Sequence, residues 1–255
     1  MAARTSWLSR PRRRRALIAA ALAAVVLTVA AIAHVRLRSP ARPPAPARVH
    51  PRVIAPTTPA GIPTVPLAPL QWIRFNGLLL PTSPTDGPSR HDDGLAAGFA
   101  RTPTGALLAA LHIAIRANAQ WGPRIYEPTI TRQVVGADAR LLLTGVRESY
   151  EQRRTQTGTA AGAPLGPVYA VQEGFRWHRY TPDQADLDLL TAGPGTSPGS
   201  TIRAATSVSV LWRGNDWRLL APAAGDWGRA AAPVATTRQF TLFTAPGGPT
   251  PSAGS

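Results

Sequence analysis

The sequence predicts an α+β domain that a single N-terminal transmembrane helix holds outside the cytoplasm. Three observations predict this arrangement. Residues 16–35 are almost entirely apolar, and residues 36–69 are rich in proline. Within residues 70–243, the spacing of apolar side chains changes near Pro167 from the period of a helix to that of a strand.

The apolar segment has the length and the flanks of a membrane anchor. Ala16–Ala33 contains one polar residue, Thr28, in 18 positions, and at ~1.5 Å per residue it spans roughly the thickness of a hydrocarbon core. Residues 1–15 hold six arginines and no acid, so the positive-inside rule predicts a cytoplasmic tail there and everything after residue 35 outside. The alternative is a signal peptide cleaved after Ala33, which would make the protein secreted.

The basic character of the chain belongs to its N-terminal flank. The net charge is +15, of which residues 1–52 contribute +11 from eleven arginines and no acid. We expect Arg12, Arg13, Arg14 and Arg15 to contact anionic lipid headgroups, at about 1 kcal/mol each. No aromatic residue interrupts that run to stack on bases, so we expect no direct nucleic-acid binding. The chain has no cysteine, which excludes disulfides and Cys-ligated metals.

The regions flanking the domain are predicted to lack a core. Residues 36–69 include ten prolines and no aromatic residue, a composition typical of an extended, semi-rigid stalk. Residues 244–255 are predicted to form a disordered tail.

The first half of the domain is predicted to be mainly helical. Trp72–Leu80 is an apolar run that we interpret as a strand, followed by a polar loop up to Gly94. Thr102 and Pro103 then provide a capping hydroxyl and a first-turn proline. The helix that they introduce, Gly105–Asn118, is apolar nearly all round and therefore predicted to be buried.

Two more helices are expected before the chain turns to strands. Trp121–Val135 is predicted to contain a short one. Asp138–Arg154 has an amphipathic pattern, with apolar residues on one stripe and charged residues on the other. Arg147 and Glu151 are one turn apart on that helix, and we expect them to form a weak ion pair.

Beyond Pro167 the apolar residues alternate. One predicted strand presents Tyr169, Val171, Phe175 and Trp177 on a common face, with Gly174 a candidate β-bulge. In the next strand, Asp186 and Asp188 alternate with apolar residues, as on a sheet with one solvated face.

A two-residue hairpin is predicted at Gly214-Asn215. It would place Trp212 opposite Trp217 and Arg213 opposite Asp216, so that aromatic and charge pairing agree with the register.

Helices followed by a meander of four strands predict a curved antiparallel sheet wrapped around helices. This order resembles the roll shared by nuclear transport factor and ketosteroid isomerase, which is also called cystatin-like.

Three short patterns imitate catalytic or metal sites, and we reject each of them. Gly195–Gly199 matches the G-x-S-x-G elbow of hydrolases, but Pro198 lacks the N–H that the oxyanion would need. His91-Asp92-Asp93 is predicted to be a solvated turn, because adjacent side chains point in different directions. Asp183, Asp186 and Asp188 lack the Gly and Glu of a calcium loop. The sequence thus predicts no metal, no cofactor and no catalytic residue.

Two pairs of residues remain as candidate binding groups. If the roll encloses a pocket, Glu173 and Tyr169 are the residues that would serve in it, and isomerase-like use of Glu173 as a base is the enzymatic alternative. Trp227 follows Asp226 between two glycines, and an exposed tryptophan there would suit contact with a partner protein.

The overall layout resembles the bitopic assembly subunits of type IV secretion machines and their counterparts in conjugative elements of Gram-positive bacteria. The stretches that carry the likeness to actinobacterial mobile-element proteins are Gly98–Ile115, Gln120–Pro123 and Trp212–Gly228. The resemblance implies a non-enzymatic membrane-anchored scaffold that binds other membrane or channel proteins, including further copies of itself. The alternative is an anchored or secreted protein of the same roll that binds or isomerises a small ligand.

Overall fold

The computed structural model describes residues 62–63, 69–197 and 199–244. The expected cytoplasmic tail and transmembrane helix (residues 1–35) lie outside these residues, as do most of the stalk and of the C-terminal tail. Within the described ranges, no helix has both the length and the hydropathy needed to cross a bilayer.

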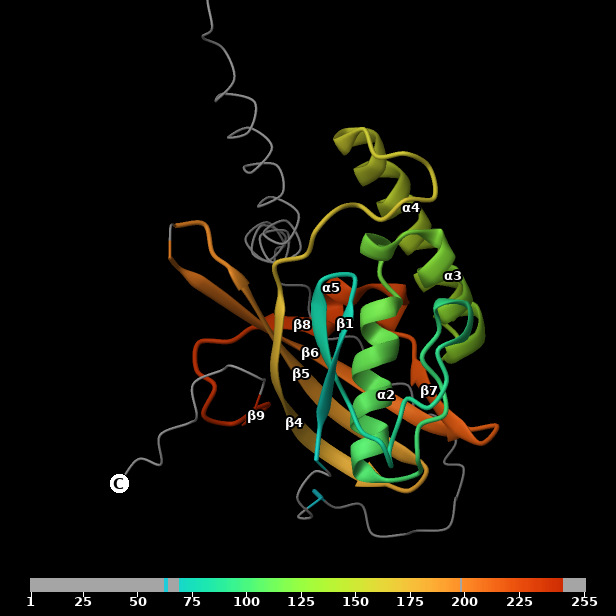
Figure 1. Ribbon diagram of the computed structural model, residues 1–255, viewed down its shortest axis with the longest axis vertical. Coiled ribbons are helices and arrows are strands. Elements are labelled where there is room, and N and C mark those ends of the chain that lie inside the picture. Colours follow the sequence, from blue (N-terminus) through green and yellow to red (C-terminus); the bar gives the residue numbers. More distant parts are fainter. Residues whose placement is uncertain (1–61, 64–68, 198, 245–255) are drawn as a thin grey trace, which may run out of the picture.

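The described residues form an α+β domain, as predicted. Helix α2 (Pro103–Arg116) lies across one face of a mixed sheet, with α3 (Pro123–Gln133) and α4 (Ala139–Thr157) beside it (Figure 1). We call the face covered by α2 the inner face and the opposite one the outer face. The strands follow the order β3 (Val134–Val135), β7 (Asp216–Leu220), β6 (Thr201–Arg213), β5 (Gln184–Pro194), β4 (Val171–Thr181) and β9 (Thr241–Leu242).

Besides the pairing of β9 with β4, two further pairings extend the four-strand meander that was expected. β8 (Ala231–Pro233) pairs with β6 and is preceded by the short helix α5 (Trp227–Ala230). β3 pairs with β7 in parallel, while the other pairs in this sheet are antiparallel. The sheet is therefore mixed, because the chain after α3 runs back along β7.

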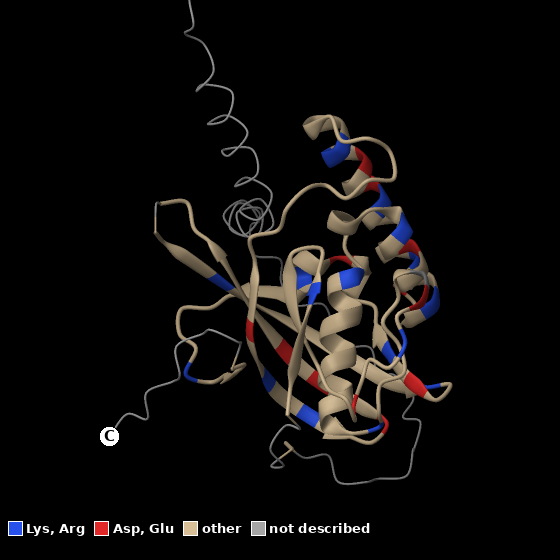
Figure 2. Ribbon diagram, viewed as in Figure 1, with Lys and Arg blue, Asp and Glu red and all other residues tan. Residues whose placement is uncertain are grey.

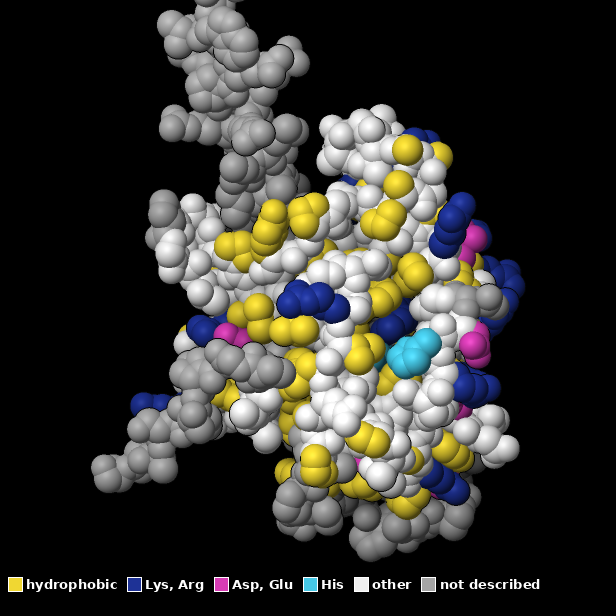
Figure 3. All heavy atoms as spheres, in the orientation of Figure 1, with side chains coloured by type: hydrophobic (Ala, Val, Ile, Leu, Met, Phe, Trp, Pro, Cys, Tyr) yellow, Lys and Arg dark blue, Asp and Glu magenta, His cyan; other side chains and the backbone are white. Residues whose placement is uncertain are grey.

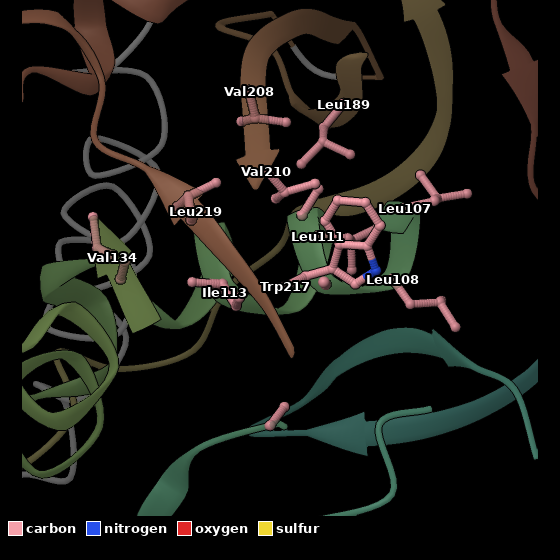
Figure 4. Packing of buried hydrophobic residues seen from close by; sticks show 14 of the residues in the cluster. Leu107, Leu108, Leu111, Ile113, Val134, Leu189, Val208, Val210, Trp217 and Leu219 are labelled. Carbon is pink, nitrogen blue, oxygen red and sulfur yellow. The ribbon is translucent and has the colours of Figure 1, made fainter. Parts of the chain in front are cut away.

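The buried helix begins where its capping residues predict. The Thr102 hydroxyl accepts a hydrogen bond from the Gly105 amide at 3.0 Å, and Pro103 is the first helical residue. Leu107 and Leu111 of α2 are fully buried, together with Trp217 of β7. Figure 4 shows the Trp217 ring over α2, among these leucines and Val210.

The two helices predicted after α2 are confirmed as α3 and α4, but the ion pair predicted within α4, between Arg147 and Glu151, is wrong. The Arg147 Nε atom lies 2.6 Å from Glu127 Oε1 in α3, and Glu151 instead pairs with Arg154 at 2.6 Å. The packing of α3 against α4 brings Glu127 within reach, a tertiary contact that spacing along α4 alone does not reveal.

The segment predicted as one strand is a hairpin. β1 (Gln71–Phe75) pairs with β2 (Leu78–Thr82) through a two-residue turn at Asn76 and Gly77. Both turn residues have positive φ, 47° and 90°, as the primed hairpin turns require. The Asn-Gly pair was thus a turn signal within the apolar run.

A β-bulge changes the predicted face of β4. Gln172 pairs with Thr191 and Gly174 with Leu190, so Glu173 is an extra residue in the ladder. Because one extra residue exchanges the two faces, Phe175 points to the inner face and is buried, whereas Tyr169 and Val171 are each 56% exposed. The four side chains do not share a face. Gly174 also matters here, since a Cβ on it would overlap the Thr241 carbonyl oxygen of β9.

The Gly214-Asn215 hairpin has the predicted register. Trp212 faces Trp217, with ring centroids 5.5 Å apart, and Arg213 faces Asp216. The expected charge pair does not form. The Asp216 carboxylate is buried and accepts hydrogen bonds from the backbone amides of Gly98 (2.8 Å) and Phe99 (3.1 Å).

Candidate functional site

The outer face of the sheet carries a network of ion pairs. Asp188 of β5 contacts Arg176 Nη2 at 2.5 Å, Ser207 Oγ at 2.7 Å and His178 Nε2 at 2.9 Å. Asp186 binds Arg179 at 2.8 Å. Figure 2 shows the acidic positions of β5 beside the basic positions of β4. Asp188 points outward as expected, but these neighbours leave its side chain only 4% exposed, so it is not solvated.

The network holds its carboxylates in the ionised form. Burial acts to raise the pKa of Asp188, but hydrogen bonds from Ser207, Arg176 and His178 outweigh it, and the pKa lies below its usual 3.8. A general acid or base at neutral pH would need a raised carboxyl pKa. The buried ion pairs and the lowered pKa of Asp188 therefore favour a structural role for this carboxylate.

The two residues expected in a pocket lie elsewhere. Glu173 is in the bulge and forms a two-pronged ion pair with Arg203 at 2.6 and 2.9 Å, on the outer face. Tyr169 points away from the domain and is exposed. The structure does not bring them together in a cavity, because the residues that line the inner pocket on this segment are Val168, Ala170 and Gln172, which alternate with Tyr169 and Glu173.

A pocket does lie on the inner face, next to the C-terminal end of α2. It has a volume of about 280 Å³. The end of β5 and the start of β6 form its floor. Its walls are α5, the start of β2 and the residues that precede β4. Hydrophobic side chains reach the surface beside the start of β4 (Figure 3). We call it the inner pocket. Its lining includes Leu78, Ile115, Trp121, Val168, Ala170, Leu189, Ile202, Ala204 and Trp227.

Two indole rings frame the inner pocket, and the end of α2 holds them. The last carbonyls of a helix have no partner within the helix. Trp121 Nε1 donates to the Ile115 carbonyl at 2.6 Å, and Trp227 Nε1 donates to the Ala117 carbonyl at 3.2 Å. Each N–H is thus used to cap α2, so both rings meet the inner pocket as apolar groups. Trp121 is otherwise buried, with its ring centroid 5.0 Å from that of Phe75.

The polar groups of the inner pocket are few. Asn118 and Gln120 are committed locally: Asn118 Oδ1 accepts from the Gln120 amide at 3.1 Å, and Gln120 Nε2 donates to the Gly166 carbonyl at 2.8 Å. Gln172 accepts from the Thr191 hydroxyl at 3.1 Å. Arg153 of α4 is the single charged residue among the described residues that line this pocket.

Of the pair Trp227 and Asp226, predicted as a partner contact, only Asp226 is exposed. Trp227 is partly buried rather than exposed, because its ring packs into the inner pocket. Asp226 is exposed and caps α5, its Oδ1 accepting from the Gly228 amide at 2.8 Å. Contact of this pair with a partner protein stays a prediction.

Two of the three rejected patterns lie outside the strands of the sheet, whereas Asp186 and Asp188 of the third lie in β5. Asp92 is in a one-turn 3₁₀ helix next to the exposed His91, and Gly195 begins the connection from β5 to β6. Within the part of the chain that the structure describes, no three His, Asp or Glu side chains are grouped to hold a metal.

Sequence reasoning missed the inner pocket, although a signal existed. Along the inner face of β5, the side chains decrease in size from Leu187 and Leu189 to Thr191 and Gly193. On β6, Ala204 faces Thr191. Small residues at one end of an otherwise large-residue face leave space that the helices do not fill.

One family model matches the chain, with the description "Domain of unknown function (DUF8175)", over residues 35–242. Neither a curated protein nor a solved structure gives a significant match.

Proposed function

The chain belongs to the DUF8175 family, and we propose that its folded domain is a non-enzymatic binding module that takes an apolar group into the inner pocket. The observation that carries this proposal is the lining of that pocket. It combines two indole rings with aliphatic side chains and contains no carboxylate among the described residues. Binding sites for small apolar ligands typically have this composition, with a few polar groups that orient the ligand.

The ion pairs on the outer face support binding rather than acid–base chemistry. Glu173, the candidate base, is held by Arg203 on the side of the sheet away from the inner pocket. An isomerase mechanism would need its carboxylate beside the bound substrate. We therefore favour ligand binding over the enzymatic alternative.

The wider setting of the module belongs to the same proposal. Residues 16–35 would anchor it in the membrane and residues 36–69 would space it outside the cytoplasm. Helices on one face of a strongly paired antiparallel meander suit the roll of nuclear transport factor, in which the space between helix and sheet is a frequent ligand site.

Filling the inner pocket tests this function. Ala204 lies on its floor, and Ala204→Trp would occupy the space, whereas Ala232→Trp adds the same ring at an exposed position of β8. We expect 1-decanol, an uncharged apolar probe, to bind the natural chain and the Ala232→Trp variant in titration calorimetry, and not the Ala204→Trp variant. Equal binding by all three, or by none, contradicts the proposal.

A scaffold role in a conjugation or secretion apparatus is the second candidate, favoured by a separate observation. The segment that leads into β4 lines the inner pocket with Val168 and Ala170. The side chains of Tyr169 and Val171, which alternate with these residues, are exposed. Adjacent exposed apolar residues suit contact with another protein. A photocrosslinking residue at position 169 should then capture a membrane protein or a second copy of the chain in cells, and one at the exposed position of Thr157 on α4 should not. Identical patterns from both positions count against a scaffold that uses this surface.

A further inference from the structure

Arg153 lacks the counter-ion that its neighbours have. On the same helix, Arg147 pairs with Glu127 and Arg154 pairs with Glu151, both at 2.6 Å. No carboxylate of the described residues lies within ion-pair distance of the Arg153 guanidinium, and Arg153 is partly buried where it meets the inner pocket.

The environment of Arg153 is costly for a lone cation. Removal of water from a charge is unfavourable unless an opposite charge or hydrogen bonds replace it. Burial lowers the pKa of Arg153, in keeping with an uncompensated charge. An anion beside the guanidinium would restore the lost interactions, and a guanidinium prefers the planar, two-oxygen geometry of a carboxylate.

The apolar interior of the inner pocket and the Arg153 guanidinium would bind different groups of one ligand. The interior offers aliphatic side chains and the rings of Trp121 and Trp227, which suit a hydrocarbon chain. The charged contact comes from Arg153 alone. The volume of about 280 Å³ lies just below the range of typical ligand pockets, about 300 to 1,000 Å³. It therefore suits one chain of medium length rather than a two-chain lipid.

We propose that the inner pocket binds a single-chain fatty acid, with its hydrocarbon chain between the two indole rings and its carboxylate on the Arg153 guanidinium. This inference rests on the proposed function, which requires an apolar ligand but not an anionic one. Arg153 is then the residue that selects acids over neutral amphiphiles of the same length.

A pair of probes that differ only in the head group separates the two claims. Decanoate and 1-decanol are titrated into the full-length chain in nanodiscs, with empty nanodiscs subtracting partition into lipid. We expect decanoate to bind at least roughly tenfold more tightly, as a charge-assisted hydrogen bond predicts. Arg153→Gln should bring the two probes to about equal affinity, and its urea unfolding midpoint, compared with that of the natural chain, reports that the variant is folded.

Arg154→Gln is the matched control, because Arg154 is adjacent in sequence, is paired with Glu151 and does not line the pocket. It should retain the preference for decanoate. Equal binding of the two probes to the natural chain, or a preference that survives Arg153→Gln, overturns the fatty-acid inference while the proposed function stands. Binding of neither probe overturns both.

Discussion

Acidification should destabilise the domain through one buried histidine. His112 of α2 is completely buried. Its Nε2 lies 2.8 Å from the Pro81 carbonyl, and its Nδ1 lies 2.9 Å from Arg116 Nη1. Because arginine can only donate, Nδ1 accepts and Nε2 carries the proton, which defines a neutral ring. Protonation of Nδ1 would remove an acceptor and place a second positive charge beside Arg116.

The size of the effect follows from the pKa. Burial chiefly, together with the charge of Arg116, lowers the pKa of His112 from 6.5 to about 3. As the pH falls below 6.5, the unfolded chain binds the proton and the folded chain does not, so the free energy of unfolding decreases. At about 1.4 kcal/mol per pH unit, the loss between about pH 7 and pH 5 is about 2 kcal/mol.

Urea unfolding followed by tryptophan fluorescence at about pH 7 and pH 5 measures this loss. Three buried or partly buried carboxyl groups, Asp86, Asp186 and Asp188, should not contribute to this loss. Burial acts to raise their pKa values, but hydrogen bonds outweigh it and hold the pKa values below 3.8. These carboxylates therefore lose their contribution to stability only in more acidic solution. His112→Gln lowers stability at both pH values but should abolish most of the difference between them. His91→Gln, at an exposed histidine, should retain it. The reasoning is refuted if His112→Gln loses as much stability between the two pH values as the natural chain does.

Three further substitutions test the packing by the same unfolding assay. Asp216→Ala leaves the buried amides that it binds without an acceptor, and we expect a loss of about 3 kcal/mol; a loss under about 1 kcal/mol would show that water replaces the carboxylate. Gly174→Ala should cost about 1–3 kcal/mol, because its Cβ would overlap the backbone of β9, and an unchanged midpoint would contradict that contact. Gly145→Ala, on α4 with open space around it, should instead stabilise by about 0.5–1 kcal/mol.

Short sequence signals predicted where helices and turns begin better than they predicted which face of a strand is buried. The capping pair Thr102-Pro103 placed the start of α2, and the Gly214-Asn215 turn placed the β6–β7 register. Both depend on residues adjacent in sequence. Which face of β4 is buried from Gly174 to Trp177 depends on the bulge at Glu173. One extra residue exchanges the two faces, until a second register shift between Trp177 and Arg179 exchanges them again.

The candidate site was harder to predict because tertiary contacts assemble it. Trp227 was singled out as an exposed contact, but its N–H caps α2, 110 residues away in sequence. The sequence pattern did not single out Arg153 among the arginines of the amphipathic helix. Only the packing of α4 beside the pocket distinguishes it from Arg154.

Quenching of tryptophan fluorescence by a brominated chain tests most directly whether an apolar ligand lies between Trp121 and Trp227. Bromine at the end of a decanol chain quenches an indole only on close contact. We expect saturable quenching in the natural chain that is reduced in Trp121→Phe or Trp227→Phe and unaffected in Trp72→Phe, because the Trp72 ring packs against Phe243 instead. Quenching of equal depth in all four proteins, or none in any, would contradict a ligand site in the inner pocket.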